Sequence, residues 1–492
     1  MKKQDVIIIG SGLGGLLCAY LLARAGKQVL VLEQGRTPGG CMQSYQRQGL
    51  TYDTGLHYVG GLSEGQLLHR LFQYAGLMEL PWQRMQPEGF DRVTIGERTF
   101  WFDQGYKAFA QRMADYFPTE GTAIRQYTEL LRETSQQELD LLRPGCDPTD
   151  QVDALVARNA YAYLKEQFQN PLLIDILSGT SLKMELRKET LPLFTFLHGN
   201  SSYIESSWRL RGGGSQLVEA LCQGIRAQGG EILCRQRATN LIERYGQLAH
   251  VRCSNGECYE ADQFISDLHP AQTTKMVRRS TKMKMRYHQR INALSNTMGM
   301  FTVSLTVRPH TYRYTNWNQY IYSQSDVWQP PSDEGKIDRL LISCRLPDDQ
   351  SAYIRQIDLL TPTPWSLWKT YEKEGRHLPN SAYTALKRQM AADCIDMASR
   401  FFPELQRTAK YHASTPLTWQ HYTQTPQGSA YGLRKDCNHP LQTFLSPRTP
   451  IPNLLMTGQS LILHGVHGVA MTALLTCAEL LGKDYIWSIL KD

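Results

Sequence analysis

Three glycines near the start of the chain have the spacing of a phosphate-binding loop. Gly10, Gly12 and Gly15 fit the pattern GxGxxG. The first permits a tight turn, the second lets backbone approach a pyrophosphate, and the third lets a helix pack closely on a strand. Glu33 follows at about the spacing of an acid that accepts hydrogen bonds from ribose hydroxyl groups. These residues predict a dinucleotide site.

The flanking sequence supplies the elements that such a site requires. Residues 5–9 form a short apolar run typical of a buried parallel strand, and residues 28–32 form a second. A helix-like stretch, 16–25, lies between them. The start of this helix, near Leu13 and Gly14, would offer unpaired N–H groups and the positive end of its dipole to the phosphates.

The next segments resemble the flavin-dependent amine oxidase and phytoene desaturase superfamily. Pro38-Gly39-Gly40 follows the acid, and Tyr52-Asp53-Thr54-Gly55 matches an aromatic-Asp-x-Gly segment that lies beside the flavin in that superfamily. The resemblance implies that the cofactor is FAD. It places against FAD the residues Glu33, Gln34, Gly39 and Gly40, and, through backbone atoms near the adenine, Ala238.

The C-terminal part of the chain agrees with this resemblance. Residues 454–456 predict a strand, Thr457-Gly458 a turn, and a helix is expected to begin near Gly465. In the superfamily this strand returns to the first domain, and the helix points its N-terminus at the flavin ring. The Gly-Gln-x-x-x-x-His-Gly form most resembles the carotenoid isomerase and retinol saturase branch. It adds four expected FAD contacts, Gly458, Gln459, Gly465 and Val466.

The resemblance also implies an α/β fold in which one domain interrupts another. We expect a discontinuous, Rossmann-like FAD-binding domain and an inserted, mixed α+β substrate domain. The spacing alone would also allow consecutive domains. The expected boundaries are residues 1–75, 206–270 and 411–492 for the FAD-binding domain, and 76–205 and 271–410 for the substrate-binding domain.

Composition limits the class of protein. A chain of 492 residues with 41% hydrophobic and 20% charged residues is ordinary for a globular protein with a sizeable core. We expect no membrane-spanning helix and no signal peptide, hence a cytoplasmic protein. Eleven scattered cysteines argue against a disulfide framework. Cys253 and Cys258 flank a predicted hairpin turn without a second pair nearby, so we expect no metal site.

The net charge of +7 comes from one segment, 275–290, which holds seven basic and no acidic residues. Outside it, basic and acidic residues are equal in number. A solvated surface segment is the simpler interpretation. A peripheral contact with anionic lipid is the alternative, worth about 1 kcal/mol per basic residue near the surface. Nucleic acid is not expected, because no stacking aromatic residues or binding module accompany the segment.

The chemistry implied by the resemblance is hydride transfer between a flavin and a long, apolar, conjugated lipid such as a carotenoid or retinol. Depending on how the transfer is completed, the product is saturated, isomerised or desaturated. The chain has no second glycine fingerprint, so electrons would be exchanged with an external donor or acceptor. A flavin amine oxidase and a non-catalytic carrier of flavin and lipid are the two rival hypotheses.

Three histidines are candidates for proton transfer, since an unperturbed imidazole titrates near ~6.5. His464 and His467 precede or begin the last long helix, and His57 follows the aromatic-Asp-x-Gly segment. Each could instead cap or pack a turn. Apolar side chains of this kind are more often ordinary core residues than pocket residues. The candidates for the lining of the expected apolar pocket are Leu193, Phe194, Phe196, Leu197, Tyr203, Trp208, Phe301 and Trp317.

Overall fold

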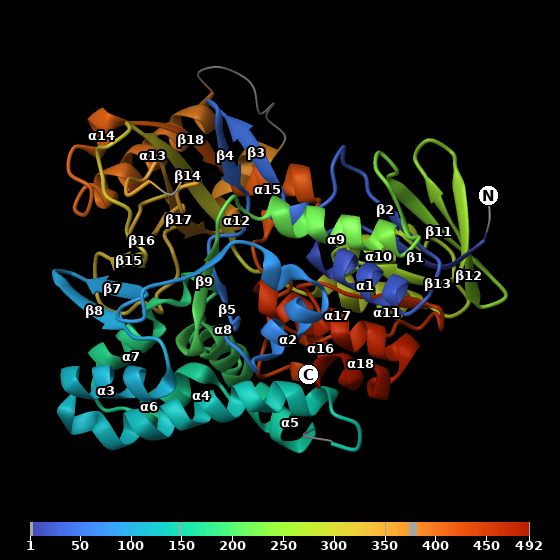
Figure 1. The fold of residues 1–492 in the computed structure, drawn as a ribbon, viewed down its shortest axis with the longest axis horizontal. Helices are drawn as coiled ribbons and strands as arrows, with labels where there is room; N and C mark the ends of the chain where they lie inside the picture. Colours follow the sequence, from blue (N-terminus) through green and yellow to red (C-terminus); the bar gives the residue numbers. More distant parts are fainter. Residues whose placement is uncertain (1–2, 147–148, 350, 373–380, 492) are drawn as a thin grey trace.

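Two seven-stranded sheets organise the chain in the computed structural model, which describes residues 3–146, 149–349, 351–372 and 381–491. The first sheet lies at the right of Figure 1, near the N-terminus. Its strands, in spatial order, are β10 (Glu231–Leu233), β2 (Val29–Leu32), β1 (Gln4–Ile9), β13 (Cys258–Ser266), β12 (Gln247–Cys253) and β11 (Ala238–Arg244), with β19 (Leu454–Met456) paired to β13.

The centre of the first sheet is parallel and buried on both faces, which explains its continuous apolar runs. Strands β10, β2, β1, β13 and β19 pair in parallel, whereas β11, β12 and the start of β13 are antiparallel. Val6 and Ile8 face one hydrophobic cluster, and Ile7 and Ile9 face another. This alternation places the two sets of side chains on opposite faces of the sheet.

Helices cover both faces of this sheet. One cluster contains residues of α1 (Leu13–Arg24), α9 (Ser215–Ala227), α17 (Gly465–Leu481), α2 (Leu67–Tyr74) and α18 (Lys483–Leu490). The other includes residues of α10 (Pro270–Met276) and of the segment before α11 (Met285–Ala293). The α/β character expected from the sequence is confirmed. The expected hairpin turn between Cys253 and Cys258 also forms.

The second sheet is mainly antiparallel, with one parallel pair, β15 and β7. Its order is β18 (Ala409–Ser414), β14 (Gly299–Val307), β17 (Gln356–Thr363), β16 (Arg339–Cys344), β15 (Asn318–Tyr322), β7 (Asp91–Ile95) and β8 (Arg98–Phe102). A small sheet of β5 (Val59–Gly60), β9 (Ser207–Leu210) and β6 (Trp82–Arg84) and the hairpin of β3 (Ser44–Arg47) and β4 (Leu50–Asp53) complete the pairing.

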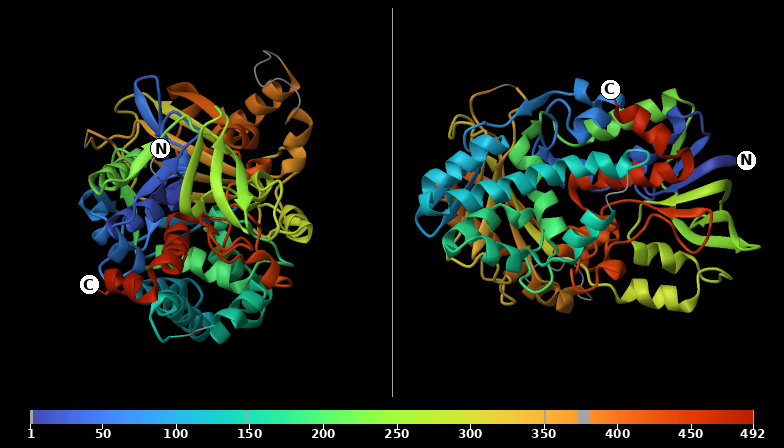
Figure 2. Two further views of the ribbon diagram at one scale, coloured as in Figure 1. Left: turned by 90° about the vertical axis from the view of Figure 1, so that its right-hand side faces the viewer. Right: turned by 90° about the horizontal axis from the view of Figure 1, so that it is seen from below.

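A helical layer covers the inner face of the second sheet (Figure 1). It consists of α3 (Tyr106–Tyr116), α4 (Gly121–Leu142), α5 (Thr149–Ala157), α6 (Ala160–Gln167), α7 (Pro171–Gly179) and α8 (Leu193–Glu205). The long helix α4 contacts the C-terminal helices α17 and α18, beside which it runs in the right-hand view of Figure 2. It therefore joins the two halves of the molecule.

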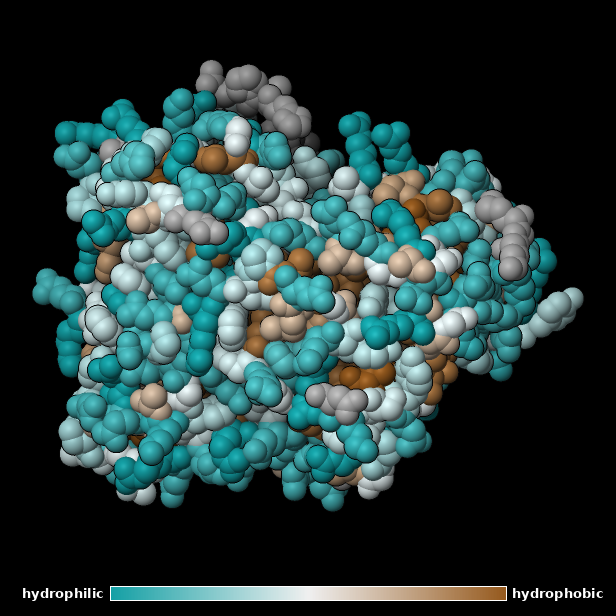
Figure 3. Space-filling view, viewed as in Figure 1, coloured by the Kyte–Doolittle hydropathy of each residue, from teal (hydrophilic) through white to brown (hydrophobic). Residues whose placement is uncertain are grey.

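The outer face of the second sheet packs on shorter elements, of which α13 (Ala382–Ala398) is the longest. The others around the C-terminal half are α12 (Trp365–Lys369), α14 (Leu405–Thr408), α15 (Pro416–Thr423) and α16 (Pro440–Thr443). The surface drawn in Figure 3 is mostly hydrophilic, with small separated apolar spots. Among the described residues, no helix has both the length and the apolar character that crossing a bilayer would need.

Strand pairing departs from the expected domain boundaries at two places. Strand β18 includes residues 411–414, which we assigned to the FAD-binding domain, yet it pairs with β14 of the second sheet. Conversely, Met276, Val277 and Met283 lie in the stretch assigned to the substrate domain but pack under the first sheet. Both departures occur where consecutive elements cross between the sheets, a feature that composition does not mark.

Candidate functional site

The carboxyl ends of β1, β13 and β19 meet at one edge of the first sheet, the edge where ligands of parallel α/β sheets bind. Helix α1 begins here, and its N-cap, Gly12, provides no side-chain cap. A Cβ at Gly15 would overlap the carbonyl oxygen of Gly10, and one at Gly14 would lie 3.2 Å from the Cα of Gly458. The two expected glycine segments, far apart in sequence, therefore form one glycine cradle (Gly10, Gly12, Gly14, Gly15 and Gly458).

The second expected glycine pair lies against the same loop. The N–H of Gly39 donates to the carbonyl oxygen of Ser11 at 2.9 Å. A Cβ at Gly40 would lie 3.1 Å from the Cα of Gly12. Both residues have positive φ, 122° and 53°, which glycine adopts without strain.

Glu33 lies at the end of β2, beside the cradle, and is buried. One of its carboxylate oxygens accepts hydrogen bonds from the N–H and the hydroxyl of Ser11, at 3.1 and 2.5 Å. The other accepts from the N–H of Gly35 at 2.6 Å. Its backbone oxygen accepts from the N–H of Gln236 at 2.7 Å, which brings the strand beginning at Ala238 close to it. Gln34 is exposed.

Asp267, which we did not select from the sequence, lies inside the glycine cradle at the end of β13. A Cβ at Gly12, Gly14 or Gly458 would lie 2.5, 2.6 or 2.7 Å from one of its carboxylate oxygens. Burial raises the pKa of this carboxyl to about 7, and the charge of Glu33 acts in the same direction. The N–H groups of Gly15 and Gly12 interact with the carboxylate and oppose the increase.

Helix α17 begins at Gly465, as expected, with His464 as its N-cap and no side-chain cap. Gly465 has φ +74° and open space at its Cβ position, while Val466 is partly exposed. The side chain of Gln459 packs near Gly432, whose Cβ would lie 3.3 Å from its Cγ. Because no side chain of the described residues caps this helix, its first N–H groups are available to a ligand.

A buried carboxylate bridges two histidines at the first turn of α17. Glu138 of α4 contacts Nε2 of His467 at 2.6 Å and Nδ1 of His198, on α8, at 2.5 Å. Burial opposes ionisation of Glu138, but the two imidazoles lower its pKa to about 2. Burial lowers the pKa of His467, and the facing Glu138 more than offsets this and raises it. Nδ1 of His467 has no hydrogen-bond partner among the described residues.

His464 has different surroundings. Its Nε2 lies 2.9 Å from the backbone oxygen of Lys183, and its ring packs on Tyr431 with centroids 4.7 Å apart. Burial lowers the pKa of His464 to about 4, with contributions from Lys435 and Lys183. The imidazole is therefore neutral near pH 7 and lacks the second proton that an imidazolium could donate.

A second buried polar group lies close by, at the junction of the two halves. Asp91 of β7 accepts hydrogen bonds from Tyr58 at 3.0 Å and from Asn318 at 2.9 Å. The hydroxyl groups of Tyr58 and Tyr320 are 2.6 Å apart. Burial lowers the pKa of the nearby Lys183 to about 8, although Asp91 acts in the opposite direction.

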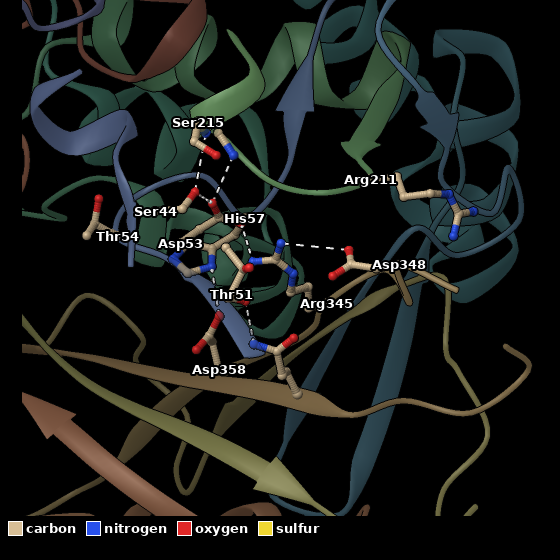
Figure 4. Close-up of polar contacts among 12 residues, drawn as sticks. Ser44, Thr51, Asp53, Thr54, His57, Arg211, Ser215, Arg345, Asp348 and Asp358 are labelled. Carbon is tan, nitrogen blue, oxygen red and sulfur yellow. Dashed lines mark hydrogen bonds and ion pairs between the residues drawn. The ribbon is translucent and has the colours of Figure 1, made fainter. Parts of the chain in front are cut away.

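His57 points to a different, polar pocket, shown in Figure 4. Its Nδ1 lies 3.7 Å from the carboxylate of Asp358. Burial raises the pKa of Asp358, and the facing His57 opposes this increase. In the same pocket Asp53 pairs with Arg345 at 3.0 Å and accepts from the N–H of Gly214 at 2.8 Å. Asp53 therefore fixes local backbone, because Gly214 is the N-cap of α9.

The expected apolar lining residues lie mainly in packed cores. Phe301 is fully buried behind the second sheet and stacks on Trp368. The guanidinium of Arg92 lies over Trp317. An apolar pocket does occur between the segment 181–186 and the second sheet, but its lining is different: Leu182, Met184, Met300, Tyr322, Val327 and Tyr431 are among its residues.

The glycine cradle fits the diphosphate of a dinucleotide. The absence of a Cβ at Gly12, Gly14 and Gly458 leaves space at this edge of the sheet, and the first turn of α1 presents N–H donors there. The carboxylate of Asp267 lies in this space and conflicts with a bound anion. No cluster of metal-ligating side chains occurs in the described ranges.

Comparison with known proteins gives concordant matches. The family described as flavin-containing amine oxidoreductase matches residues 13–481. Human all-trans-retinol 13,14-reductase is 25% identical over 541 residues, which cover 100% of this chain and 87% of the human protein. A chloroplast prolycopene isomerase of an Oncidium hybrid cultivar is 24% identical over 289 residues, 54% of this chain and 48% of that protein.

A solved structure of putrescine oxidase bound to putrescine matches the fold. The TM-score is 0.66 at 15% sequence identity, covering 98% of this chain and 99% of the oxidase. At this identity the likeness concerns the arrangement of the chain and not the substrate.

Proposed function

The chain belongs to the flavin-containing amine oxidoreductase family, and from this membership we propose that it is an FAD-dependent oxidoreductase acting on C=C or CH–CH bonds of a long, apolar, conjugated lipid. The observation that carries the substrate class is the match of the whole chain to a retinol 13,14-reductase. The match to a prolycopene isomerase supports it, because that name also denotes a polyene enzyme.

We infer that the first sheet with its helices is the discontinuous, Rossmann-like FAD-binding domain. The second sheet and its helical layer would then be the inserted substrate domain. In support, strands of the first sheet come from three separated segments, β1–β2, β10–β13 and β19. The apolar pocket lies on the second sheet's inner side, against the helical layer, where an apolar lipid would be shielded from water.

FAD, when bound, supplies the group that accepts or donates a hydride. In this proposal the cradle and the first turn of α1 hold its pyrophosphate, and Glu33 accepts hydrogen bonds from the ribose. The segment at Gly39 and Gly40 would lie along the cofactor. The N-terminus of α17, at Gly465 and Val466, would stabilise negative charge near the ring.

The pair of His467 and Glu138 gives the chain a place to hold a proton. Because Nε2 of His467 faces the carboxylate, the second proton of the imidazolium sits on Nδ1, which has no partner among the described residues. Saturation of a double bond consumes one proton with each hydride, whereas isomerisation consumes none. We therefore expect His467, and not His464, to be the proton donor if the reaction is a saturation.

A polyene panel tests this function. Purified protein is reduced without oxygen and offered retinol-like and carotenoid-like substrates, and the product mass is measured. A gain of two hydrogens indicates saturation, an unchanged mass with altered absorbance indicates isomerisation, and a loss of two by the oxidised protein indicates desaturation. Under the proposal, His467→Gln lowers a saturation rate by about 10²-fold or more, while His464→Gln has the smaller effect.

The same assay separates the rival functions. An amine oxidase would produce hydrogen peroxide from amines and leave polyenes unchanged. A non-catalytic carrier would bind lipid without any change in the flavin spectrum. Either result would overturn the proposed function.

We also propose an external electron donor or acceptor, because the chain has no second dinucleotide fingerprint, and a peripheral contact of the 275–290 segment with anionic lipid. Six of its seven basic residues are exposed. Met285 is 70% exposed, and Tyr245, next to the hairpin glycine that Lys282 approaches, is fully exposed. Binding to anionic but not to neutral vesicles, weakened by Lys282→Glu with Lys284→Glu, is the expected result.

A further inference from the structure

The position of Asp267 carries an inference that rests on FAD binding but goes beyond it. We propose that Asp267 is a built-in competitor for the pyrophosphate of FAD, so that binding requires its carboxylate either to leave the glycine cradle or to take up a proton. Asp267 would then set how strongly the protein holds its cofactor and make that affinity depend on pH.

The geometry is the first support. The carboxylate oxygens lie 2.5 to 2.7 Å from the Cβ positions of Gly12, Gly14 and Gly458, and therefore occupy the space that these glycines leave open. The N–H groups of Gly12 and Gly15 interact with the same oxygens. A carboxylate is thus held at the N-terminus of α1 as a phosphate would be. Two anions cannot share these donors in one orientation.

The surrounding charges are the second support. The titratable groups that face Asp267 are Glu33, at the end of β2, and the thiol of Cys41. Cys41 is exposed, and the Asp267 charge raises the pKa of its thiol above the ordinary value, so this thiol is neutral near pH 7. Glu33 is the one neighbour among them that carries charge, and it is negative. A pyrophosphate arriving here therefore meets two carboxylates of its own sign.

Protonation removes the conflict. A neutral Asp267 carboxyl can donate a hydrogen bond to a phosphate oxygen, whereas the ionised form repels it. With the pKa of this carboxyl near 7, the neutral form becomes scarce just above neutral pH. If the neutral form alone accommodates FAD without rearrangement, affinity falls by up to about tenfold for each pH unit above that pKa.

FAD release from the holoprotein tests the proposal. Protein saturated with FAD is diluted at pH 6.0 and at pH 8.5, and free FAD is measured by its fluorescence. We expect the wild-type Kd to rise at least tenfold between the two values. Asp267→Asn, which is neutral at both, is expected to bind at least tenfold tighter than wild type at pH 8.5 and to lose the pH dependence. Asp262→Asn is the matched control, because Asp262 is an exposed acid on the same strand.

Calorimetry provides a second readout. FAD binding at pH 8.5 in two buffers of different ionisation enthalpy should reveal uptake of up to one proton by wild type and none by Asp267→Asn. Wild-type affinity that is independent of pH, or weaker FAD binding by Asp267→Asn at both pH values, would overturn the competitor role alone. Failure of every variant, Asp262→Asn included, to bind FAD would instead overturn the proposed function.

Discussion

The glycine cradle and the cluster of His467, Glu138 and His198 lie at the starts of two helices, yet they are built in opposite ways. The cradle consists of the backbone of glycines, which have no side chains, and the spacing of these glycines is visible in the sequence. The histidine cluster is made of three side chains from α17, α4 and α8, held by a buried carboxylate. The first kind of site can be predicted from local sequence, whereas the second forms only when helices distant in sequence pack together.

Substitution of Gly12 tests the cradle most severely. In Gly12→Leu the new side chain would fill the space between α1 and the end of β13, and a pyrophosphate could not approach the backbone. We expect FAD binding to fall by more than about 100-fold, equivalent to about 3 kcal/mol. The measurement is flavin absorbance per protein after purification with excess FAD.

Gly229→Asn is the control for this change, since its Cβ position is open and its φ of +84° suits asparagine. It should keep its flavin. Full flavin content in Gly12→Leu would show that the cradle does not hold the cofactor.

Removal of Glu138 tests the histidine cluster. Glu138→Ala leaves two buried imidazoles without their carboxylate, so we expect the free energy of unfolding to fall by about 3–5 kcal/mol. Urea unfolding at pH 6 measures the change. Glu133→Ala, at an exposed site of the same helix, should change it by less than about 0.5 kcal/mol. Equal effects of the two substitutions would mean that the cluster contributes nothing beyond helix propensity.

The same cluster predicts how stability depends on pH. The lowered pKa of Glu138 contributes stability that is present above its ordinary value of 4.5 and is lost as pH falls toward about 2. The raised pKa of His467 contributes stability that is present below its ordinary value of 6.5 and is lost as pH rises through the folded value. The advantage of wild type over Glu138→Gln should therefore be largest between about pH 4.5 and 6.5.

We expect this advantage to be about 1–3 kcal/mol inside that window and to shrink on both sides. Urea titrations of both proteins at pH 3.5, 5.5 and 8.5 measure it. A difference that is constant over the three values would contradict the assigned ionisation of the pair.

The smallest of these effects concerns the buried polar group of Asp91, Tyr58 and Tyr320. Tyr58→Phe removes a hydroxyl that bonds to Asp91 and Tyr320, and leaves a buried carboxylate with one partner fewer. We expect a loss of about 1–2 kcal/mol in unfolding free energy. Tyr245→Phe, at a fully exposed position, should cause no measurable change. A comparable loss in both would show that the Tyr58 hydroxyl is not important for stability.

The contrast explains which features the sequence could reveal. Strands β1, β2 and β19 and the starts of α1 and α17 fall within a residue or two of expectation, because periodicity and glycine spacing act locally. Asp267 carries a usable signal in the sequence, since an acid at the carboxyl end of a parallel strand lies at the ligand-binding edge. FAD contacts of the individual residues stay predictions.

Glu138 had no such signal. It is one of several acids in an amphipathic helix, and its burial depends on α4 lying against α8 and α17. His198 likewise is one of several polar residues in α8, and its sequence position does not distinguish it from the others. Pairing across the chain likewise determines which sheet an element joins, as β18 and α10 show, so the domain boundaries stay predictions.

The closing of the cradle by β19 and α17 bears on how the protein is made. The fingerprint leaves the ribosome early, but residues 454–481, which pair with β13 and pack on α1, are translated long afterwards. Contacts so distant in sequence form slowly and leave intermediates exposed. We therefore expect the cradle to close only after these late segments have been made, and a chain stalled before them to be a target for chaperones and proteases.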